Sequence, residues 1–160
     1  MASGSATYEI ESSVEAARLF KATVFEWHIL APKIIPEVVA SAAIIEGEGA
    51  IGAVRQINFS PALPFGYMKE RLDFLDLDKL ECKQTLVEGG HIGSKVETAS
   101  TDFKFEPAPG GGCVCKVVTS YKLLPGVEED EGELVKSKET VTAIIKAAEG
   151  YLLANPEACA

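Results

Sequence analysis

The sequence predicts an α+β protein in which a strongly curved antiparallel sheet wraps around a long C-terminal helix. Most segments between residues 38 and 124 alternate apolar and polar side chains, which is the two-residue period of strands. Residues 134–152 instead repeat apolar side chains at the spacing of one helix face. The whole chain has 160 residues, the size of one domain, so we expect a single domain over residues 1–160.

The first elements along the chain are a strand and two helices. Residues 7–12 can form a short strand, and apolar residues at helical spacing predict a helix over residues 14–27. Ser12 or Ser13 is the expected N-cap of that helix, because a hydroxyl oxygen can accept from a free N–H of the first turn. A second short helix, bounded by prolines, is expected over residues 29–35.

Six strands and one long helix follow. The segment between Glu97 and Glu106 shows the cleanest alternation, which is typical of a sheet with one solvated face. The final helix should cover about 22 residues and stop at Asn155-Pro156, since the residue before a proline disfavours helical geometry. The expected strands cover residues 38–46, 54–59, 65–76, 80–87, 97–106 and 113–124.

A glycine-rich motif, Gly47, Gly49 and Gly52, matches the G-x-G-x-x-G spacing of dinucleotide-binding proteins. That fingerprint needs a helix after the glycines, because the N–H groups of its first turn hold the pyrophosphate. Residues 54–59 read as a strand instead, and Glu48 would repel a phosphate. We therefore expect a tight connection between two strands.

The amino-acid composition disfavours several classes of binding partner. The net charge of −9 and the pI of about 4.8 disfavour nucleic acid, and no apolar run is long enough to span a membrane. The four cysteines, Cys82, Cys113, Cys115 and Cys159, do not have the spacing of a metal site or a redox pair. We expect reduced thiols in a cytoplasmic protein with no metal and no cofactor.

Several motifs occur together in an order that resembles the plant PR-10 / Bet v 1 family of pathogenesis-related proteins. The resemblance covers nearly the whole chain and implies a START-like helix-grip fold. Such a fold has seven strands, two short helices and an internal cavity for small apolar ligands. The motifs are Ala17–Ala22, Pro32-Lys33, Glu46–Gly52, Pro64-Phe65-x-Tyr67-x-Lys69-x-Arg71, Val87–Gly90 with Ile92-Gly93, and Ala148–Ala154.

The resemblance also implies a set of cavity residues. The inferred inward strand faces carry small and polar side chains, which could line a hollow for partly polar ligands or simply pack with neighbours. The expected ligand is a small apolar or amphipathic plant metabolite, such as a phytohormone, cytokinin or flavonoid, bound by a monomer or weak dimer. The candidates are Tyr67, Glu70, Cys82, Gln84, Thr101, Phe103, Cys115, Tyr121, Lys138 and Ile144.

Hormone signalling of the abscisic acid type, through inhibition of a protein phosphatase, is a role that the wider fold implies. Two enzymatic alternatives stay open. A ribonuclease would use Glu97, Glu149 and Tyr151, with Arg55 where the family usually has a lysine. Arginine stays protonated and cannot exchange a proton, and the acidic charge opposes RNA capture.

The second alternative is an amine–aldehyde condensing enzyme of alkaloid synthesis. It would use Glu70 and Tyr67 to move protons and Lys138 to stabilise charge. We expect a binding protein rather than either enzyme.

Overall fold

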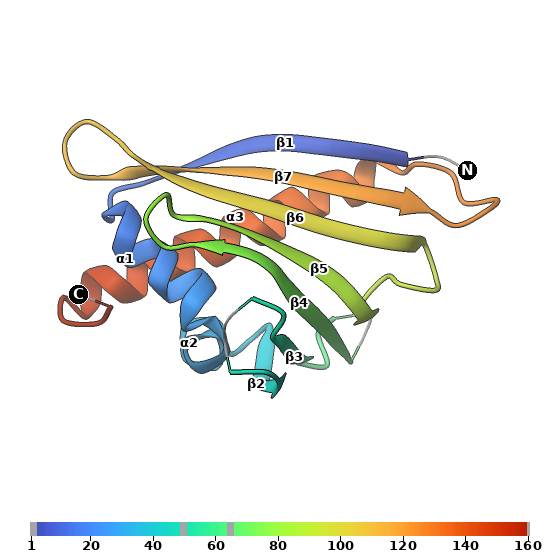
Figure 1. Cartoon of the computed structure of the whole chain (residues 1–160), viewed down its shortest axis with the longest axis horizontal. Coiled ribbons are helices and arrows are strands. Elements are labelled where there is room, and N and C mark those ends of the chain that lie inside the picture. The colour runs from blue at the N-terminus through green and yellow to red at the C-terminus, as the bar shows by residue number, and fades with distance from the viewer. Residues whose placement is uncertain (1–2, 49–50, 64–65, 160) are drawn as a thin grey trace.

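The computed structural model describes residues 3–48, 51–63 and 66–159. A seven-stranded antiparallel sheet curls around one long helix, as Figure 1 shows. The strands are β1 (Ser3–Ser12), β2 (Val39–Glu46), β3 (Val54–Phe59), β4 (Tyr67–Asp76), β5 (Glu81–Gly89), β6 (Val96–Pro107) and β7 (Cys113–Leu123), in the spatial order β1-β7-β6-β5-β4-β3-β2. The helices are α1 (Ala16–Phe20), the π-helix η1 (Lys21–Phe25), α2 (Trp27–Ile34) and α3 (Glu131–Ala154). The predicted fold class is confirmed.

The long helix α3 begins earlier than its apolar stripe suggests. Asp130 is its N-cap, and the Asp130 carboxylate accepts hydrogen bonds from the backbone N–H groups of Gly132 and Glu133. Acidic residues in the first turn also suit the positive end of the helix dipole. The acidic segment that precedes the apolar repeat is therefore partly the helix start.

The first helical region differs from the sequence expectation. Instead of one helix over residues 14–27, a short α1 passes into η1, and the backbone at Glu26 departs from helical geometry before α2 begins. The N-cap of α1 is Glu15, with no side-chain hydrogen bond, so the expectation of Ser12 or Ser13 is wrong. The Ser12 hydroxyl accepts from the Val14 N–H at 3.2 Å and shapes the turn before the helix.

One side chain attaches the C-terminal end of α3 to α1. The Arg18 guanidinium donates to the carbonyl oxygens of Leu152, Asn155 and Ala158 at 2.9–3.2 Å. Helix ends leave carbonyl groups without partners inside the helix, and a cation there also suits the helix dipole. This end of α3 is therefore fixed by several hydrogen bonds.

The interior of the sheet has two unlike parts. The first, which we call the closed end, packs α1 and the last turns of α3 against the sheet, and its side chains are at most 2 % exposed. It consists of Leu19, Phe20, Phe105, Cys115, Ile145 and Leu152. A second buried cluster joins α2 to β2 and β3 through Trp27, Ala31, Ile35, Val39 and Ile57.

The other part, which we call the open end, lies towards the first turns of α3. Inward side chains of β5, β6 and β7 are only partly buried there, namely Leu86, Ala99, Thr101, Thr119 and Tyr121. On the facing part of α3, residues 131–142, Val135 is 55 % exposed. No helix in the described part of the chain has the length and apolar character needed to cross a membrane.

Candidate ligand-binding site

Strand register decides which predicted residues share the inner face of the sheet. Phe103 lies opposite Cys82, and Thr101 lies opposite Gln84. Side chains of directly opposed residues point to the same face of a sheet, and every second residue along each strand joins them. The predicted residues Glu70, Cys82, Gln84, Thr101, Phe103, Cys115 and Tyr121 therefore lie on the inner face.

A buried polar cluster sits among them. Arg55 and Glu70 are opposed across β3 and β4, and Arg55 is only 7 % exposed. One Nη of Arg55 donates to the Val24 carbonyl oxygen at 2.6 Å. With the Gln84 amide oriented to satisfy both neighbours, its oxygen accepts from Arg55 at 2.6 Å and its nitrogen donates to Glu70 at 3.3 Å. The three side chains therefore satisfy one another within the apolar interior.

The charges in this cluster balance. Burial raises the pKa of Glu70 while Arg55 opposes that rise, and burial lowers the pKa of Arg55 while Glu70 opposes that fall. An arginine remains protonated even so. Burial also raises the pKa of Cys82 to about 12, so its thiol is neutral. The Arg55 guanidinium and the Glu70 carboxyl group thus lie on paired strands and are joined through the Gln84 amide.

A small hollow adjoins the cluster. Its volume of about 10 Å³ is room for roughly one water molecule. His28 faces the hollow, and its Nδ1 atom is buried without a hydrogen-bond partner among the described residues. Burial and the nearby Arg55 lower the pKa of His28, which keeps the imidazole neutral at pH 7. The walls are Val24, Phe25, Ile44, Ala53, Leu72 and Leu75, with His28 and Arg55.

Lys138 and Ile144 project from different parts of α3. The Lys138 Nζ atom lies 5.8 Å from the centroid of the Tyr8 ring, in cation–π range. Lys138 also borders a groove of about 490 Å³ between β1 and α3. Ile144 packs against the cluster around Trp27. Sequence reasoning missed Tyr8, although strand alternation along β1 places it on the same face as the buried Ile10.

Tyr121 joins the open end to the segment that leads into α3. Its hydroxyl donates to the Glu129 carboxylate, and this hydrogen bond raises the pKa of Tyr121 to about 12. Gly4, opposite it on β1, leaves the space that the ring occupies, since a Cβ there would lie 2.4 Å from the Tyr121 hydroxyl oxygen. The ring thus borders the open end from one edge of the sheet.

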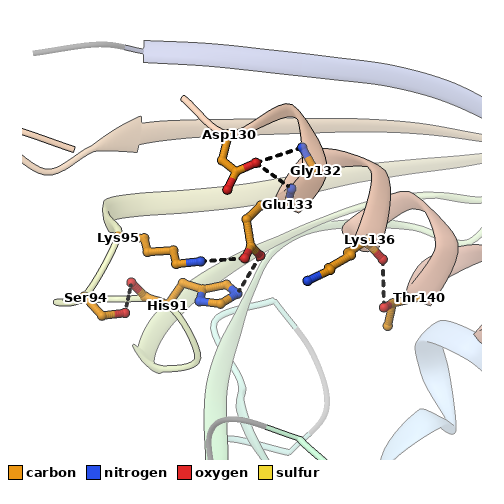
Figure 2. Close-up of polar contacts among 8 residues, drawn as sticks. All are labelled: His91, Ser94, Lys95, Asp130, Gly132, Glu133, Lys136 and Thr140. Atoms are coloured by element: carbon orange, nitrogen blue, oxygen red, sulfur yellow. Dashed lines mark hydrogen bonds and ion pairs between the residues drawn. The ribbon is translucent and has the colours of Figure 1, made fainter. Parts of the chain in front are cut away.

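A polar cluster also holds the start of α3 to the β5–β6 loop (Figure 2). Lys95 Nζ lies 2.6 Å from one carboxylate oxygen of Glu133, and His91 Nε2 lies 4.0 Å from the other. All three side chains are about one third or more exposed to solvent. Such exposed ion pairs contribute little stability, so this end of α3 is held more weakly than the end at Arg18.

Tyr67 lies on the other side of the sheet. It is 37 % exposed, and its hydroxyl donates to the Glu88 carboxylate at 2.6 Å. Its neighbour Met68 points inward and packs on the cluster around Trp27. The cavity role predicted for Tyr67 therefore has no geometric support, and Tyr67 cannot share a substrate with Glu70 inside the sheet.

The three residues considered for ribonuclease chemistry are not brought together. Glu97 is at the start of β6 and pairs with Lys122 at 3.3 Å, whereas Glu149 lies beside Ser12 and Lys146, near the far end of that strand. Ten residues of strand span about 30 Å, so the two carboxylates cannot act on one ribose. Tyr151 packs against the closed end.

The glycine loop is a tight turn between β2 and β3. Gly47 and Gly52 have φ values of +76° and +93°, and a Cβ on Gly47 would lie 3.0 Å from the Ala53 Cα. The Gly52 N–H already donates to the Leu72 carbonyl oxygen at 2.7 Å. Gly49 lies outside the described residues. A strand follows the loop, as the sequence predicted, and Gly47 and Gly52 adopt a backbone conformation that other residues rarely take.

Comparison with known proteins agrees with this architecture. The model of the pathogenesis-related protein Bet v 1 family matches residues 1–155. The chain belongs to the Bet v 1 family. Pathogenesis-related protein 1 of Asparagus officinalis is 52 % identical over 159 residues, which are 99 % of each chain.

Solved structures share the Bet v 1 fold over nearly the whole chain. The crystal structure of Ara h 8.0201 superposes with a TM-score of 0.84 at 29 % identity and covers 96 % of this chain and 100 % of that one. Norcoclaurine synthase from Thalictrum flavum, in complex with dopamine and hydroxybenzaldehyde, gives a TM-score of 0.74 at 22 % identity over 96 % and 88 % of the two chains. The second likeness concerns the fold alone.

Proposed function

We propose that this Bet v 1-family protein binds a small, largely apolar plant metabolite between the sheet and the first turns of α3. The observation that carries the proposal is the contrast inside the sheet. Thr101, Thr119 and Tyr121 point to the side covered by α3 and stay partly exposed, while side chains at the closed end are sealed from solvent. A protein that needed only a packed core would fill the open end with large aliphatic side chains.

The lining suits an amphipathic ligand such as a phytohormone, a cytokinin or a flavonoid. Phe103 and Leu86 offer apolar contact, and Thr101 and Gln84 offer hydrogen bonds. Burial of about 200–300 Å² of apolar ligand surface contributes roughly 5–7 kcal/mol before association costs, which favours micromolar affinity. The solved norcoclaurine synthase complex supports small-molecule binding by this fold.

Binding, rather than catalysis, is the role that the side chains favour. The residues considered for condensation are split between two faces and a solvent-exposed helix position, and those considered for RNA cleavage lie far apart. A cytoplasmic location suits four free cysteines, three of which are buried. A role in hormone signalling would require the liganded protein to inhibit a protein phosphatase. A phosphatase activity assay with and without the ligand tests this role.

A pair of matched variants tests the site. Thr101→Phe adds a ring at the open end, whereas Ser100→Phe adds the same ring one residue away on the outer face of β6. We expect Nile red, a neutral apolar dye, to bind the natural protein and to be displaced by members of a metabolite panel. Thr101→Phe should weaken dye binding at least tenfold, and Ser100→Phe should change it less than twofold.

The proposal fails if the dye does not bind, if no metabolite displaces it, or if both variants bind it equally. Circular dichroism and thermal unfolding of the two variants establish that each is folded. Native mass spectrometry of protein purified from its own tissue then identifies the ligand that it carries.

A further inference from the structure

The buried polar cluster determines which head group a ligand can carry. Arg55 is a buried cation beside the polar inner face of β4 and β5, and a carboxylate ligand would be expected to seek it. Its guanidinium is already engaged by the Val24 carbonyl and the Gln84 amide, and it faces Glu70 across the strands. A carboxylate brought to this place would meet the Glu70 carboxyl group, and the Arg55 guanidinium that could offset its charge is already hydrogen-bonded.

From this arrangement we propose that the site selects ligands with a neutral hydrogen-bonding head group, such as an amide or hydroxyl, and rejects carboxylates. This inference rests on the proposed function and specifies its ligand class. Glu70 is the residue that sets the selectivity, because it cancels the charge of Arg55. Gln84 is the anchor, since its amide can both donate to and accept from a neutral polar group.

Three further ionisable groups, His28, Cys82 and Lys138, do not offer a carboxylate ligand a buried positive charge. His28 is neutral at pH 7 because burial and Arg55 both disfavour its protonation, and the Cys82 thiol is neutral as well. Lys138 is a further cation near the sheet interior, but it is solvent-exposed and lies over the Tyr8 ring. A hydrated surface ammonium offers a carboxylate little more than water does.

The physical basis is the cost of moving an ionised carboxylate out of water. Such a transfer is expensive unless a charge partner and hydrogen bonds replace the lost hydration. A neutral amide or hydroxyl loses less hydration and finds its hydrogen-bond partner at Gln84. Two ligands that differ only in this head group should therefore differ in affinity by at least tenfold.

The first experiment uses the unmodified protein and a matched ligand pair. Indole-3-acetamide and indole-3-acetic acid share one skeleton, and cinnamyl alcohol and cinnamic acid provide a second pair. Displacement of Nile red at pH 7.5 gives the dissociation constants. We expect the neutral member of each pair to bind at least tenfold more tightly than its acid. Equal affinity, or tighter binding of the acid, overturns the inference while leaving the proposed function intact.

The second experiment tests whether Glu70 sets the preference for neutral ligands over acids. Glu70→Gln keeps the side-chain shape and removes the negative charge, so that Arg55 becomes available to an anion. We expect the affinity for the acids to rise at least tenfold, while the affinity for the neutral members changes less than threefold. Glu88→Gln is the matched control, because Glu88 pairs with Tyr67 and Lys69 on the outer face of the same pair of strands. Lys138→Gln should leave the neutral-to-acid ratio unchanged.

If folded Glu70→Gln binds the acids no more tightly than the natural protein, Glu70 does not set the selectivity. The same conclusion follows if the Glu88→Gln control gains as much affinity for the acids. A collapse of the ratio in Lys138→Gln would place the selectivity on the helix instead. If Glu70→Gln does not fold, the comparison of ligand pairs on the unmodified protein still decides the inference. Failure of the dye and of every ligand to bind would remove the proposed function itself, and the inference with it.

Discussion

The closed and open ends are built from the same strands and the same helix, yet they differ in what fills them. At the closed end, Phe105, Ile145 and Leu152 are at most 2 % exposed. At the open end, Thr101 and Thr119 occupy corresponding inner positions of β6 and β7 and remain partly exposed. The difference teaches that the tightly packed side chains are concentrated in one half of the interior, while the other half carries smaller and more polar side chains.

The largest expected effect tests whether the closed end contributes more to stability than the open end. Leu152→Ala removes a fully buried side chain from the closed end and should lower the free energy of unfolding by about 3–4 kcal/mol, because it leaves a cavity. Thr101→Ala at the open end should cost less than about 1 kcal/mol. Urea denaturation of both variants measures the two values. Equal losses would contradict the division into two ends.

A somewhat smaller loss is expected at the polar cluster. Arg55→Leu leaves the Glu70 carboxylate buried without its cation, and breaking such a pair costs about 3 kcal/mol. The folded-state pKa of Glu70 is already raised by burial, and loss of Arg55 raises it further. A raised carboxyl pKa favours the folded state at low pH, and that contribution disappears as the pH rises through the folded pKa.

The deficit of Arg55→Leu should therefore be larger at pH 7 than at pH 5. Urea denaturation at the two pH values measures it. The double variant Arg55→Leu with Glu70→Leu is the control, and it should lose the pH dependence and recover part of the stability. A deficit that is the same at both pH values would show that packing, rather than charge, dominates at this position.

A gain in stability is expected at the fixed end of α3. Gly150 lies in the helix, and a Cβ added there would meet nothing within 4 Å. Gly150→Ala should stabilise the protein by about 0.5–1 kcal/mol, because alanine has the higher helix propensity. Dye affinity should stay unchanged, since the substitution is remote from the open end. A thermal shift assay with and without dye checks both statements.

The smallest effect belongs to the cluster in Figure 2. Hydrogen bonding to Lys95 is the largest of the effects that together lower the folded-state pKa of Glu133. A lowered carboxyl pKa contributes stability above the unfolded pKa, and this contribution is lost as the pH falls through the folded pKa. Glu133→Gln should therefore cost no more than about 1 kcal/mol at pH 7 and nothing measurable in strongly acidic buffer.

Hydrogen exchange adds a local measurement of the same contact. Amides in the first turns of α3 should exchange faster in Glu133→Gln than in the natural protein, because the helix start loses a contact with the β5–β6 loop. Amides near Leu152 should exchange at an unchanged rate. Faster exchange along the whole helix would show that α3 opens as one unit.

Much of the fold could be predicted from the sequence because alternation and helical spacing are local signals. The seven strands and α3 follow from those periods, and the family motifs order them. The sequence predicts a break near residue 28, but its true position at Glu26 could not be seen, because buried residues such as Val24 and Trp27 continue the apolar pattern across Glu26. A helical period alone does not distinguish a continuous helix from a kinked one.

The site was less predictable, for reasons that differ among residues. Tyr67 and Glu70 are three positions apart on the part of β4 that pairs with β3 in unbroken register, so the two-residue period places them on opposite faces. Arg55 alternates with Ile57 on an apolar face, a signal of a buried cation that could have been used. The separation of Glu97 from Glu149 depends on tertiary structure, which no local pattern contains.

The hydrogen bonds from Arg18 to the last carbonyl groups of α3 have a consequence for the speed of binding. They fix one end of the helix, while the other end depends on exposed side chains of the β5–β6 loop. Thermal fluctuations are then largest at the end that is held more weakly. If a metabolite binds at the open end as proposed, its entry and escape would require only a small tilt of a single helix, and its residence time would depend on that tilt and not on global unfolding.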